Sequence, residues 1–246
     1  NSITINGGRY SKKSPDFFGD FVEKLPAKLN SVNCKGKFIW FDFDNGWKLW
    51  NTLGMTGGWK KDNAKHCHFT FEFEGITLYF EDMRNFGTMK FNNSKTDFNK
   101  KIKSLGTDIF KEDFTLDYVN KIFKTKRNQK KTIVDILMNQ KLFCGVGNYL
   151  KAEILYATKI SPHRLVENLS EEDINNIHKF TIKISAASFK HGGASVRDYS
   201  NLDGKDGEYT DLLKVYGQKE DPLGHKIKRE QTTDKRTTHW VPEIQK

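Results

Sequence analysis

The sequence predicts an α+β protein of several domains, in which an N-terminal half built of antiparallel sheet precedes a helical region and a C-terminal hairpin. Three observations support this prediction. Residues 1–90 alternate apolar and polar side chains in short runs separated by turn residues, which is the pattern of half-buried strands. From about residue 95 the apolar spacing changes to the helical period. After residue 207 short strand-like runs return.

The N-terminal half contains a strand-like start at residues 2–5 and two predicted hairpins. Residues 38–43 lead through Asp-Asn-Gly into residues 47–50, and residues 69–73 turn at Glu-Gly into residues 76–80. A polar stretch at residues 91–95 marks the end of this half. We therefore expect a β-sandwich over residues 1–100, a linker over 101–112, a helical domain over 113–207 and a terminal hairpin domain over 208–246.

The second half carries one strong helix signal and one hairpin signal. Ser170 and Asp173 resemble a capping box, and the apolar positions that follow share one helix face until Gly192 and Gly193 end it. Residues 226–230 and 236–241 read as two strands around a polar turn.

Composition narrows the class of partner. The 246 residues include 41 Lys and Arg against 31 Asp and Glu, a net charge of +10, which favours a polyanion such as nucleic acid over an anionic membrane surface. The mean hydropathy of −0.70 and the lack of a long apolar run argue against a membrane span. Cys34, Cys67 and Cys144 are too few and too irregularly spaced for a disulfide framework or a zinc knuckle, which fits a reducing, intracellular setting.

Two further patterns have unremarkable explanations. Residues 121–131 hold six basic residues and no acidic one, and a solvated helix face would explain them. His66 and His68 share a strand face with no further ligands nearby in sequence, so we expect no metal site there.

The glycine-framed turn at residues 140–148 is the most informative stretch. Gly145 and Gly147 would let the backbone approach a ligand closely, and we expect Asn148 to cap a helix whose free amides and dipole favour an anion. This pattern indicates a phosphate clamp, although an ordinary turn between two helices would also explain it.

The order of these pieces resembles the formamidopyrimidine-DNA glycosylase and endonuclease VIII family. The resemblance rests on the sandwich, the segments LMNQKLFCGVGNYLKAEILYATKISP and HGGASVRDYSNLDGKDGEY, and the basic C-terminal hairpin ending RTTHWVPEIQ. It implies a helix-two-turn-helix domain, two domains around a DNA cleft, and a monomer that needs no cofactor. The implied partner is double-stranded DNA with an oxidised base or an abasic site. The implied activity is base flipping, glycosidic cleavage and strand nicking by β,δ-elimination.

The resemblance also implies roles for single residues. Asn148, with Gly145 and Gly147 beside it, matches the ligand of the phosphates that flank the lesion, and Arg236 matches an arginine at the finger tip that grips the same phosphates. Lys37 matches a lysine close to the damaged nucleotide, and Tyr216 matches a further phosphate contact. A solvated lysine and a packed aromatic ring are the alternatives for these last two.

A flipped base leaves a gap in the stack, and three residues match the family's gap-filling set. Met55 supplies an apolar wedge, Arg84 a guanidinium and Phe86 an aromatic ring, which are the chemical types that such a gap accepts. Without the resemblance, Met55 and Phe86 would be assigned to the core.

Two departures from the family's pattern favour its endonuclease VIII-like branch. The finger has no cysteines, since residues 222–225 read Pro-Leu-Gly-His, so it resembles a zincless finger in which strand pairing and packing of Trp240 replace the metal's folding energy. Thr52 stands where the formamidopyrimidine branch carries a histidine. On this analogy we expect oxidised pyrimidines as substrates.

The third departure concerns the nucleophile. The family uses an N-terminal proline followed by glutamate, and the sequence begins instead at Asn1, so we expect the first helix and strand of the family's sandwich to be missing and the chain as given to lack activity. Lys37 is the substitute amine, provided that its surroundings lower its pKa. The leading hypothesis is a bifunctional DNA glycosylase and abasic-site lyase. The alternatives are a catalytically silent protein that binds damaged DNA and, more remotely, a binder of structured RNA.

Overall fold

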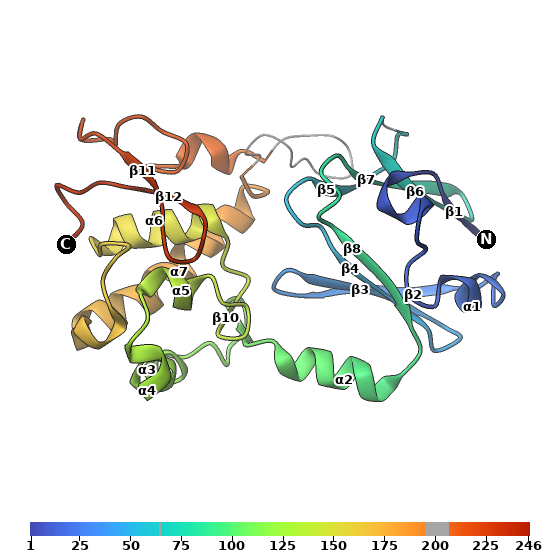
Figure 1. The fold of residues 1–246 in the computed structure, drawn as a ribbon, viewed down its shortest axis with the longest axis horizontal. Helices are drawn as coiled ribbons and strands as arrows, with labels where there is room; N and C mark the ends of the chain where they lie inside the picture. Colours follow the sequence, from blue (N-terminus) through green and yellow to red (C-terminus); the bar gives the residue numbers. More distant parts are fainter. Residues whose placement is uncertain (64, 195–206) are drawn as a thin grey trace. The chain divides into compact units, whose positions relative to one another are not determined.

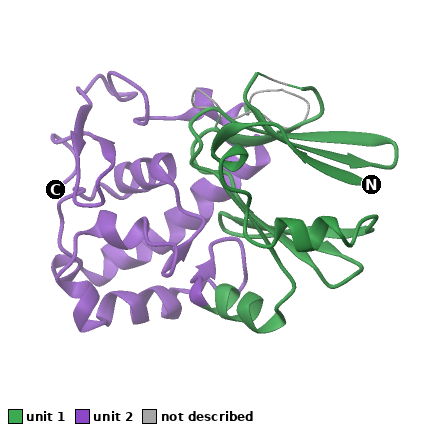
Figure 2. Cartoon of the chain, turned by 45° about the vertical axis from the view of Figure 1, so that its right-hand side comes forward, with its two compact units in different colours: residues 1–103, 194–207 green, residues 104–193, 208–246 purple. Residues whose placement is uncertain are grey.

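The computed structural model of the chain describes residues 1–63, 65–194 and 207–246 (Figure 1). The chain forms two compact units, shown in two colours in Figure 2. Unit 1 comprises residues 1–103 with residues 194–207, and unit 2 comprises residues 104–193 with residues 208–246. Most of the segment HGGASVRDYSNLDGKDGEY, on which the family resemblance partly rests, lies outside the described residues.

Unit 1 is built on two four-stranded antiparallel sheets. The first has the strand order β1 (Ser2–Ile5), β6 (Cys67–Phe73), β7 (Ile76–Asp82), β5 (Gly57–Lys60). The second has the order β2 (Leu29–Lys35), β3 (Phe38–Phe43), β4 (Lys48–Thr52), β8 (Thr88–Asn92). The register pairs Phe41 with Leu49 and Phe71 with Leu78, which confirms both predicted hairpins. The predicted first strand is confirmed by the pairing of β1 with β6.

An aromatic core joins the inner faces of the two sheets. Phe41 of the second sheet packs on Trp59 of the first at 5.1 Å between ring centroids, and Trp59 packs in turn on Phe71 and Phe80. Phe21, from the short helix α1 (Phe18–Val22), stacks on Phe91 at 4.9 Å. Because alternate residues of each strand supply this core, the predicted β-sandwich is confirmed.

Unit 2 is mainly helical. Helix α2 (Lys95–Ser104) precedes it and belongs to unit 1 except for its last residue. Within unit 2 the short strands β9 (Thr107–Asp108) and β10 (Phe143–Cys144) pair in parallel. The later helices are α3 (Leu116–Lys124), α4 (Lys126–Gln129), α5 (Ile133–Leu137), α6 (Asn148–Thr158) and α7 (Glu171–Lys190), with 3-10 turns at Val166–Asn168 and Tyr209–Leu212. Ser170 and Asp173 exchange the two hydrogen bonds of a capping box at the start of α7, as predicted.

The chain ends in an antiparallel hairpin of β11 (Lys228–Gln231) and β12 (Thr237–Trp240). Trp240 is buried and its indole donates to Glu230 Oε1 at 2.7 Å. A small core containing Ala152, Val215 and Val241 connects the hairpin region to α6. Among the described residues, none of the helices is both long and apolar enough to cross a bilayer.

Candidate nucleic-acid interface

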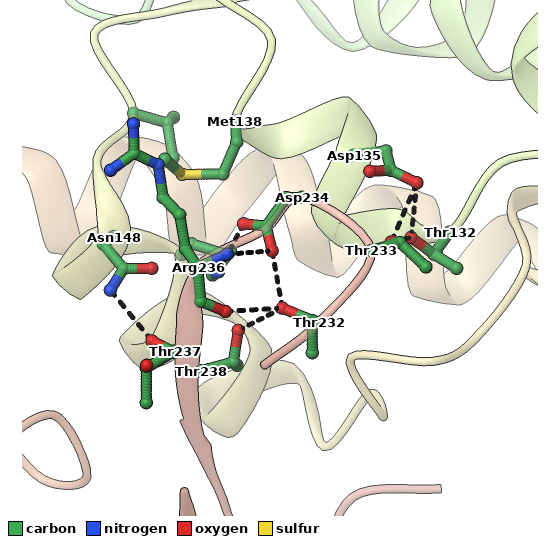
Figure 3. A network of polar contacts seen from close by, with 12 residues as sticks. Thr132, Asp135, Met138, Asn148, Thr232, Thr233, Asp234, Arg236, Thr237 and Thr238 are labelled. Atoms are coloured by element: carbon green, nitrogen blue, oxygen red, sulfur yellow. Dashed lines mark hydrogen bonds and ion pairs between the residues drawn. The ribbon is translucent and has the colours of Figure 1, made fainter. Parts of the chain in front are cut away.

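Asn148 does not cap helix α6, contrary to the sequence prediction. It is the first residue of the helix, and Gly147 precedes it as an N-cap without a side-chain hydrogen bond. The Asn148 side chain turns instead toward the C-terminal hairpin, where its Nδ2 donates to Thr237 O at 2.9 Å (Figure 3). The amide is thus engaged by tertiary structure, and no local pattern could have shown this.

The second N–H of the Asn148 amide is only weakly engaged. Besides the bond to Thr237, Nδ2 makes one other hydrogen bond within the described residues, to the Tyr216 hydroxyl at 3.5 Å, which is the long limit for such a bond. The Oδ1 atom is buried without a partner in the described part of the chain. A phosphate oxygen would accept a much shorter hydrogen bond from the same N–H.

The glycine turn before α6 is held by Gln140. Its Oε1 accepts from Gly145 N at 3.0 Å, and its Nε2 donates to Val146 O at 2.9 Å. Gly145 has a φ of 115°, which side chains rarely tolerate, so a glycine is required there. Gly147 has an extended backbone with φ −115° that any residue could adopt. The glycines were predicted from the sequence, whereas the role of Gln140 in holding the turn was not.

Arg236 lies at the hairpin tip, next to Asn148's partner Thr237. Its side chain is exposed, and in Figure 3 the guanidinium points away from the polar network around Asp234. Within the described residues no carboxylate pairs with it. The hydrogen bond from Asn148 to Thr237 thus brings two kinds of donor close together. They are the cationic guanidinium of Arg236 on the hairpin and the neutral amide of Asn148 on helix α6.

Lys151 fixes the hairpin tip to helix α6, and the sequence analysis did not identify it. Its ammonium is fully buried and lies 2.6 Å from Asp234, whose side chain is also buried. Asp234 further accepts from the Thr232 hydroxyl at 2.5 Å. Burial lowers the pKa of Lys151, the hydrogen bond to Asp234 opposes that shift, and the charge of nearby Arg236 adds to it. Asn148 and Lys151 are three residues apart and therefore lie on the same face of helix α6. That face both presents the Asn148 side-chain amide and binds the hairpin tip through Lys151.

A second contact holds the tip from helix α5. Asp135 Oδ2 accepts from the hydroxyls of Thr132 and Thr233, each at 2.9 Å, and the two hydroxyls lie 2.6 Å apart (Figure 3). Thr233 belongs to the tip, whereas Thr132 and Asp135 flank the start of α5. The turn that carries Arg236 is consequently anchored to two helices.

Tyr216 is positioned by Glu153, a buried carboxylate on α6. Glu153 accepts from the backbone N–H groups of Lys214, Val215 and Tyr216 at 2.9–3.0 Å. The Tyr216 ring packs edge-on against His239 at 4.7 Å. Asn148, Tyr216 and Arg236, predicted separately, therefore lie together in unit 2.

We expect the stability of this region to fall as the pH drops from 6.5 toward 4. Burial, with the charges of Arg229 and Lys151, lowers the pKa of His239 to about 4 from 6.5. In that window the unfolded chain binds the proton and the folded chain does not, so acid favours unfolding, by on the order of 3 kcal/mol once both pKa values are passed. Denaturant titrations at pH 7.5 and pH 5 measure the change.

His239→Gln is the matched variant for that measurement, since it keeps a neutral side chain that cannot titrate. Glu230 does not interfere: its pKa is lowered to about 2, chiefly by the hydrogen bond from Lys228, so its contribution is lost only as the pH falls below 4.5. An unchanged pH dependence in His239→Gln would contradict the assignment.

The predicted gap-filling residues lie on two loops of unit 1. Met55 is 45% exposed and Phe86 is 54% exposed, so neither belongs to the core. Arg84 places its guanidinium 5.0 Å from the Phe86 ring centroid. A Cβ at Gly54 would lie 2.7 Å from the Phe86 backbone, which shows that the two loops are in direct contact. The three predicted residues are thus gathered on one exposed edge.

Asp82 holds these two loops together and was not identified from the sequence. It is 1% exposed, and its carboxylate accepts from the Thr56 hydroxyl at 2.5 Å and from Gly87 N at 2.6 Å. Thr56 Oγ1 in turn accepts from Arg84 N at 3.0 Å. The buried carboxylate of Asp82 thereby holds both loops in place, the one that carries Met55 and the one that carries Arg84 and Phe86.

Lys37 lies elsewhere in unit 1. It is exposed in the two-residue turn between β2 and β3, where Gly36 has a φ of 55°. A lysine on a hairpin tip can reach a nucleic-acid backbone.

No three His, Cys, Asp or Glu side chains in the described ranges are grouped so as to hold a metal ion. In the C-terminal region His225 Nδ1 pairs with the Asp221 carboxylate at 3.0 Å. His68 lies on β6, an inner strand of the first sheet, and its burial lowers its pKa.

Comparison with known proteins gives concordant matches over almost the whole chain. The formamidopyrimidine-DNA glycosylase N-terminal domain matches residues 8–89, its H2TH domain residues 105–200 and its C-terminal domain residues 200–246. The formamidopyrimidine-DNA glycosylase of Listeria innocua is 37% identical over 242 residues, covering 92% of this chain and 85% of the relative. That of Streptococcus agalactiae is 33% identical, covering 90% and 81%.

Solved structures agree. The MutM (Fpg) protein of Thermus thermophilus superposes with a TM-score of 0.87 at 25% identity, covering 100% of this chain and 90% of that one. Lactococcus lactis Fpg in complex with abasic-site DNA gives 0.86 at 27% identity, covering 100% and 91%. Taken with the fold and the gathered residues, these matches show that the chain belongs to the formamidopyrimidine-DNA glycosylase family.

Proposed function

We propose that this protein is a base-excision DNA glycosylase with abasic-site lyase activity, acting as a monomer on damaged duplex DNA. The observation that carries the proposal is the grouping of Asn148, Tyr216 and Arg236 in unit 2. Lactococcus lactis Fpg, a structural neighbour, was solved in complex with abasic-site DNA. Phosphate oxygens are strong acceptors for the hydrogen bonds that an arginine fork and an amide N–H donate.

In this proposal the two units perform different tasks. The clamp of Asn148, Tyr216 and Arg236 grips backbone phosphates beside the lesion. Met55, Arg84 and Phe86 enter the stack where the damaged base has been rotated out, which offsets part of the unstacking cost of a few kcal/mol. An amine then attacks the sugar C1′, and the base leaves with the electron pair of the glycosidic bond and takes up a proton. Cleavage of the C1′–O4′ bond opens the sugar and gives a Schiff base, which permits loss of the 3′ and then the 5′ phosphate by successive eliminations.

The identity of the amine is open to a direct experiment. Lys37 is our candidate within the 246 residues. The other candidate is an N-terminal proline, which is supplied by adding to the chain a segment that begins with Pro-Glu. Borohydride reduction on abasic-site duplex traps the Schiff base covalently. If the 246-residue chain is trapped and the Lys37→Gln change abolishes trapping, Lys37 is supported as the amine. If only the extended protein is trapped, the proline is supported.

Failure to trap with either protein, while tight binding to damaged duplex persists, would contradict the enzyme proposal and favour the catalytically silent DNA-binding alternative. Lys35→Gln, on the neighbouring strand, is the matched control for Lys37→Gln. It removes the same charge from the same hairpin.

Two observations point to different substrates. The curated relatives are named formamidopyrimidine-DNA glycosylases, and a Lactococcus lactis Fpg mutant was solved with Fapy-dG DNA, which favours a ring-opened purine. Thr52 and the cysteine-free finger favour oxidised pyrimidines, as in an endonuclease VIII-like protein. Excision from duplexes carrying either Fapy-dG or an oxidised pyrimidine, compared by kcat/KM, decides between them.

Phe86→Ala is expected to weaken binding to duplex with a lesion while leaving binding to undamaged duplex nearly unchanged. Stacking of an aromatic ring on a base contributes about 1–3 kcal/mol, and Phe86 would stack only where a base has been removed from the helix. Fluorescence anisotropy with paired duplexes measures both affinities.

Ile76→Ala is the control for that experiment, because Ile76 is another exposed apolar side chain of unit 1. Equal losses of affinity for the two duplexes in Phe86→Ala would assign the ring a structural role and would contradict gap filling.

A further inference from the structure

Two adjoining hollows on unit 2 lie beside the clamp. The first, of about 450 Å³, is lined by Lys131, Asp135, Met138, Asn139 and Asp234. The second, of about 400 Å³, is lined by Arg127, Asn128, Lys131, Asn139, Lys141 and Leu142. Because Lys131 and Asn139 line both, the hollows form one groove. We call the part around Arg127, Lys131 and Lys141 the basic groove.

Hydrogen bonds fix the backbone that carries these cations. Asn128 is buried and donates from Nδ2 to Ile122 O at 2.9 Å, and its carbonyl accepts from Lys131 N at 3.0 Å. Asn139 Oδ1 accepts from Lys141 N at 3.0 Å. The basic groove is therefore a shaped surface of defined segments.

The basic groove carries more positive than negative charge in the described part of the chain. Across the described ranges, none of the recorded ion pairs involves Arg127, Lys131 or Lys141. Of the two carboxylates in the first hollow, Asp234 pairs with buried Lys151, whereas Asp135 accepts from two neutral threonine hydroxyls and keeps its charge. The three cations therefore exceed the one unpaired carboxylate. Three cations around a concave surface attract an anion, and the field is focused where the surface is hollow.

The groove continues from the clamp. Asp234, two residues before Arg236, lines its first hollow together with Met138, and Figure 3 shows these residues beside Asn148. We propose that the basic groove binds the sugar-phosphate backbone of the same DNA molecule, beyond the phosphates held by Asn148 and Arg236. The occupant is the backbone because Arg, Lys and amide N–H groups donate to phosphate oxygens, while Leu142 can contact a sugar. This inference rests on the proposed function.

The test is the triple variant R127Q/K131Q/K141Q, with affinity for undamaged duplex measured across a range of salt concentrations. We expect affinity at moderate salt to fall about tenfold and the slope of log affinity against log salt to shrink by about one for each phosphate that the variant no longer binds. The loss should be the same with a lesion present. The difference in affinity between the variant and the unaltered protein should disappear on duplexes that are shortened on the side bound by the basic groove, because the phosphates of that arm are then missing.

The matched control is K121Q/K124Q/K126Q, which removes three charges from the same basic run at exposed positions that do not line the groove. Equal losses in the two triple variants would overturn the proposal and leave general electrostatic attraction. No loss in the groove variant would overturn it too. The double variant R127Q/K141Q, which alters two exposed side chains, repeats the test if the triple variant does not fold.

Arg236→Ala, measured in parallel, separates this inference from the proposed function. If Arg236→Ala weakens binding and the groove variant does not, only the basic groove is refuted. If neither change weakens binding, the DNA-binding proposal itself fails.

Discussion

Replacing Lys151 with Met is expected to lower the free energy of unfolding by about 3 to 5 kcal/mol, the largest effect on stability that the structure predicts. The ammonium is fully buried against Asp234, and Met has similar length and no charge. Removal of the cation leaves a carboxylate in a site with little water, where its charge is poorly solvated. Thermal or denaturant unfolding measures the loss.

The double variant of Lys151→Met with Asp234→Leu is the decisive control, because it removes both charges. Replacing a whole buried ion pair by apolar side chains is often neutral for stability, so we expect the double variant to recover much of the loss. A double variant as unstable as Lys151→Met would show that packing, and not the unpaired carboxylate, causes the effect. Weakened DNA binding in the single variant is also expected, since Asp234 helps to hold the turn that carries Arg236.

Replacing Arg236 with Ala is expected to weaken duplex binding by about 1 to 3 kcal/mol, which corresponds to a loss of about 5- to 150-fold in affinity. The guanidinium is exposed at the hairpin tip without a carboxylate partner in the described residues, so the variant leaves the protein's own ion pairs intact. Stability should change little. Anisotropy titrations with a lesion-containing duplex measure the affinity.

Two further variants define what Arg236 supplies. Arg236→Lys keeps the charge but loses the planar fork, and we expect it to recover only part of the affinity. Lys235→Asn removes the neighbouring charge, and Asn tolerates the left-handed backbone at that position, where φ is 59°. If Lys235→Asn weakened binding as much as Arg236→Ala, the effect would be one of net charge and the clamp assignment would be wrong.

Much of the architecture follows from periodicity in the sequence. Alternating residues in β3, β4, β6 and β7 place one apolar set on the inner face of each sheet, and a sheet with such a face must cover it with another layer. The set comprises Phe41, Phe43, Leu49, Phe69, Phe71 and Phe80. Ser170 and Asp173 specify the start of α7 locally, because both partners of the capping box are three residues apart. Asn148, Tyr216, Arg236 and the gap-filling triad could be named only because the family's motifs mark those positions.

The supports of these residues were decided by tertiary structure alone. Lys151 and Asp234 lie 83 residues apart, and Glu153 binds backbone more than 60 residues away. Asn148 looked like a helix cap, yet its amide bonds to Thr237, 89 residues on. The spacing of apolar residues along the chain indicates which residues share a face of a strand or helix. The sequence by itself therefore determined the sandwich, the helices and the hairpin. Partners of buried polar groups depend on which distant segments the fold brings together, and a buried Lys or Asp looks the same in sequence as a solvated one.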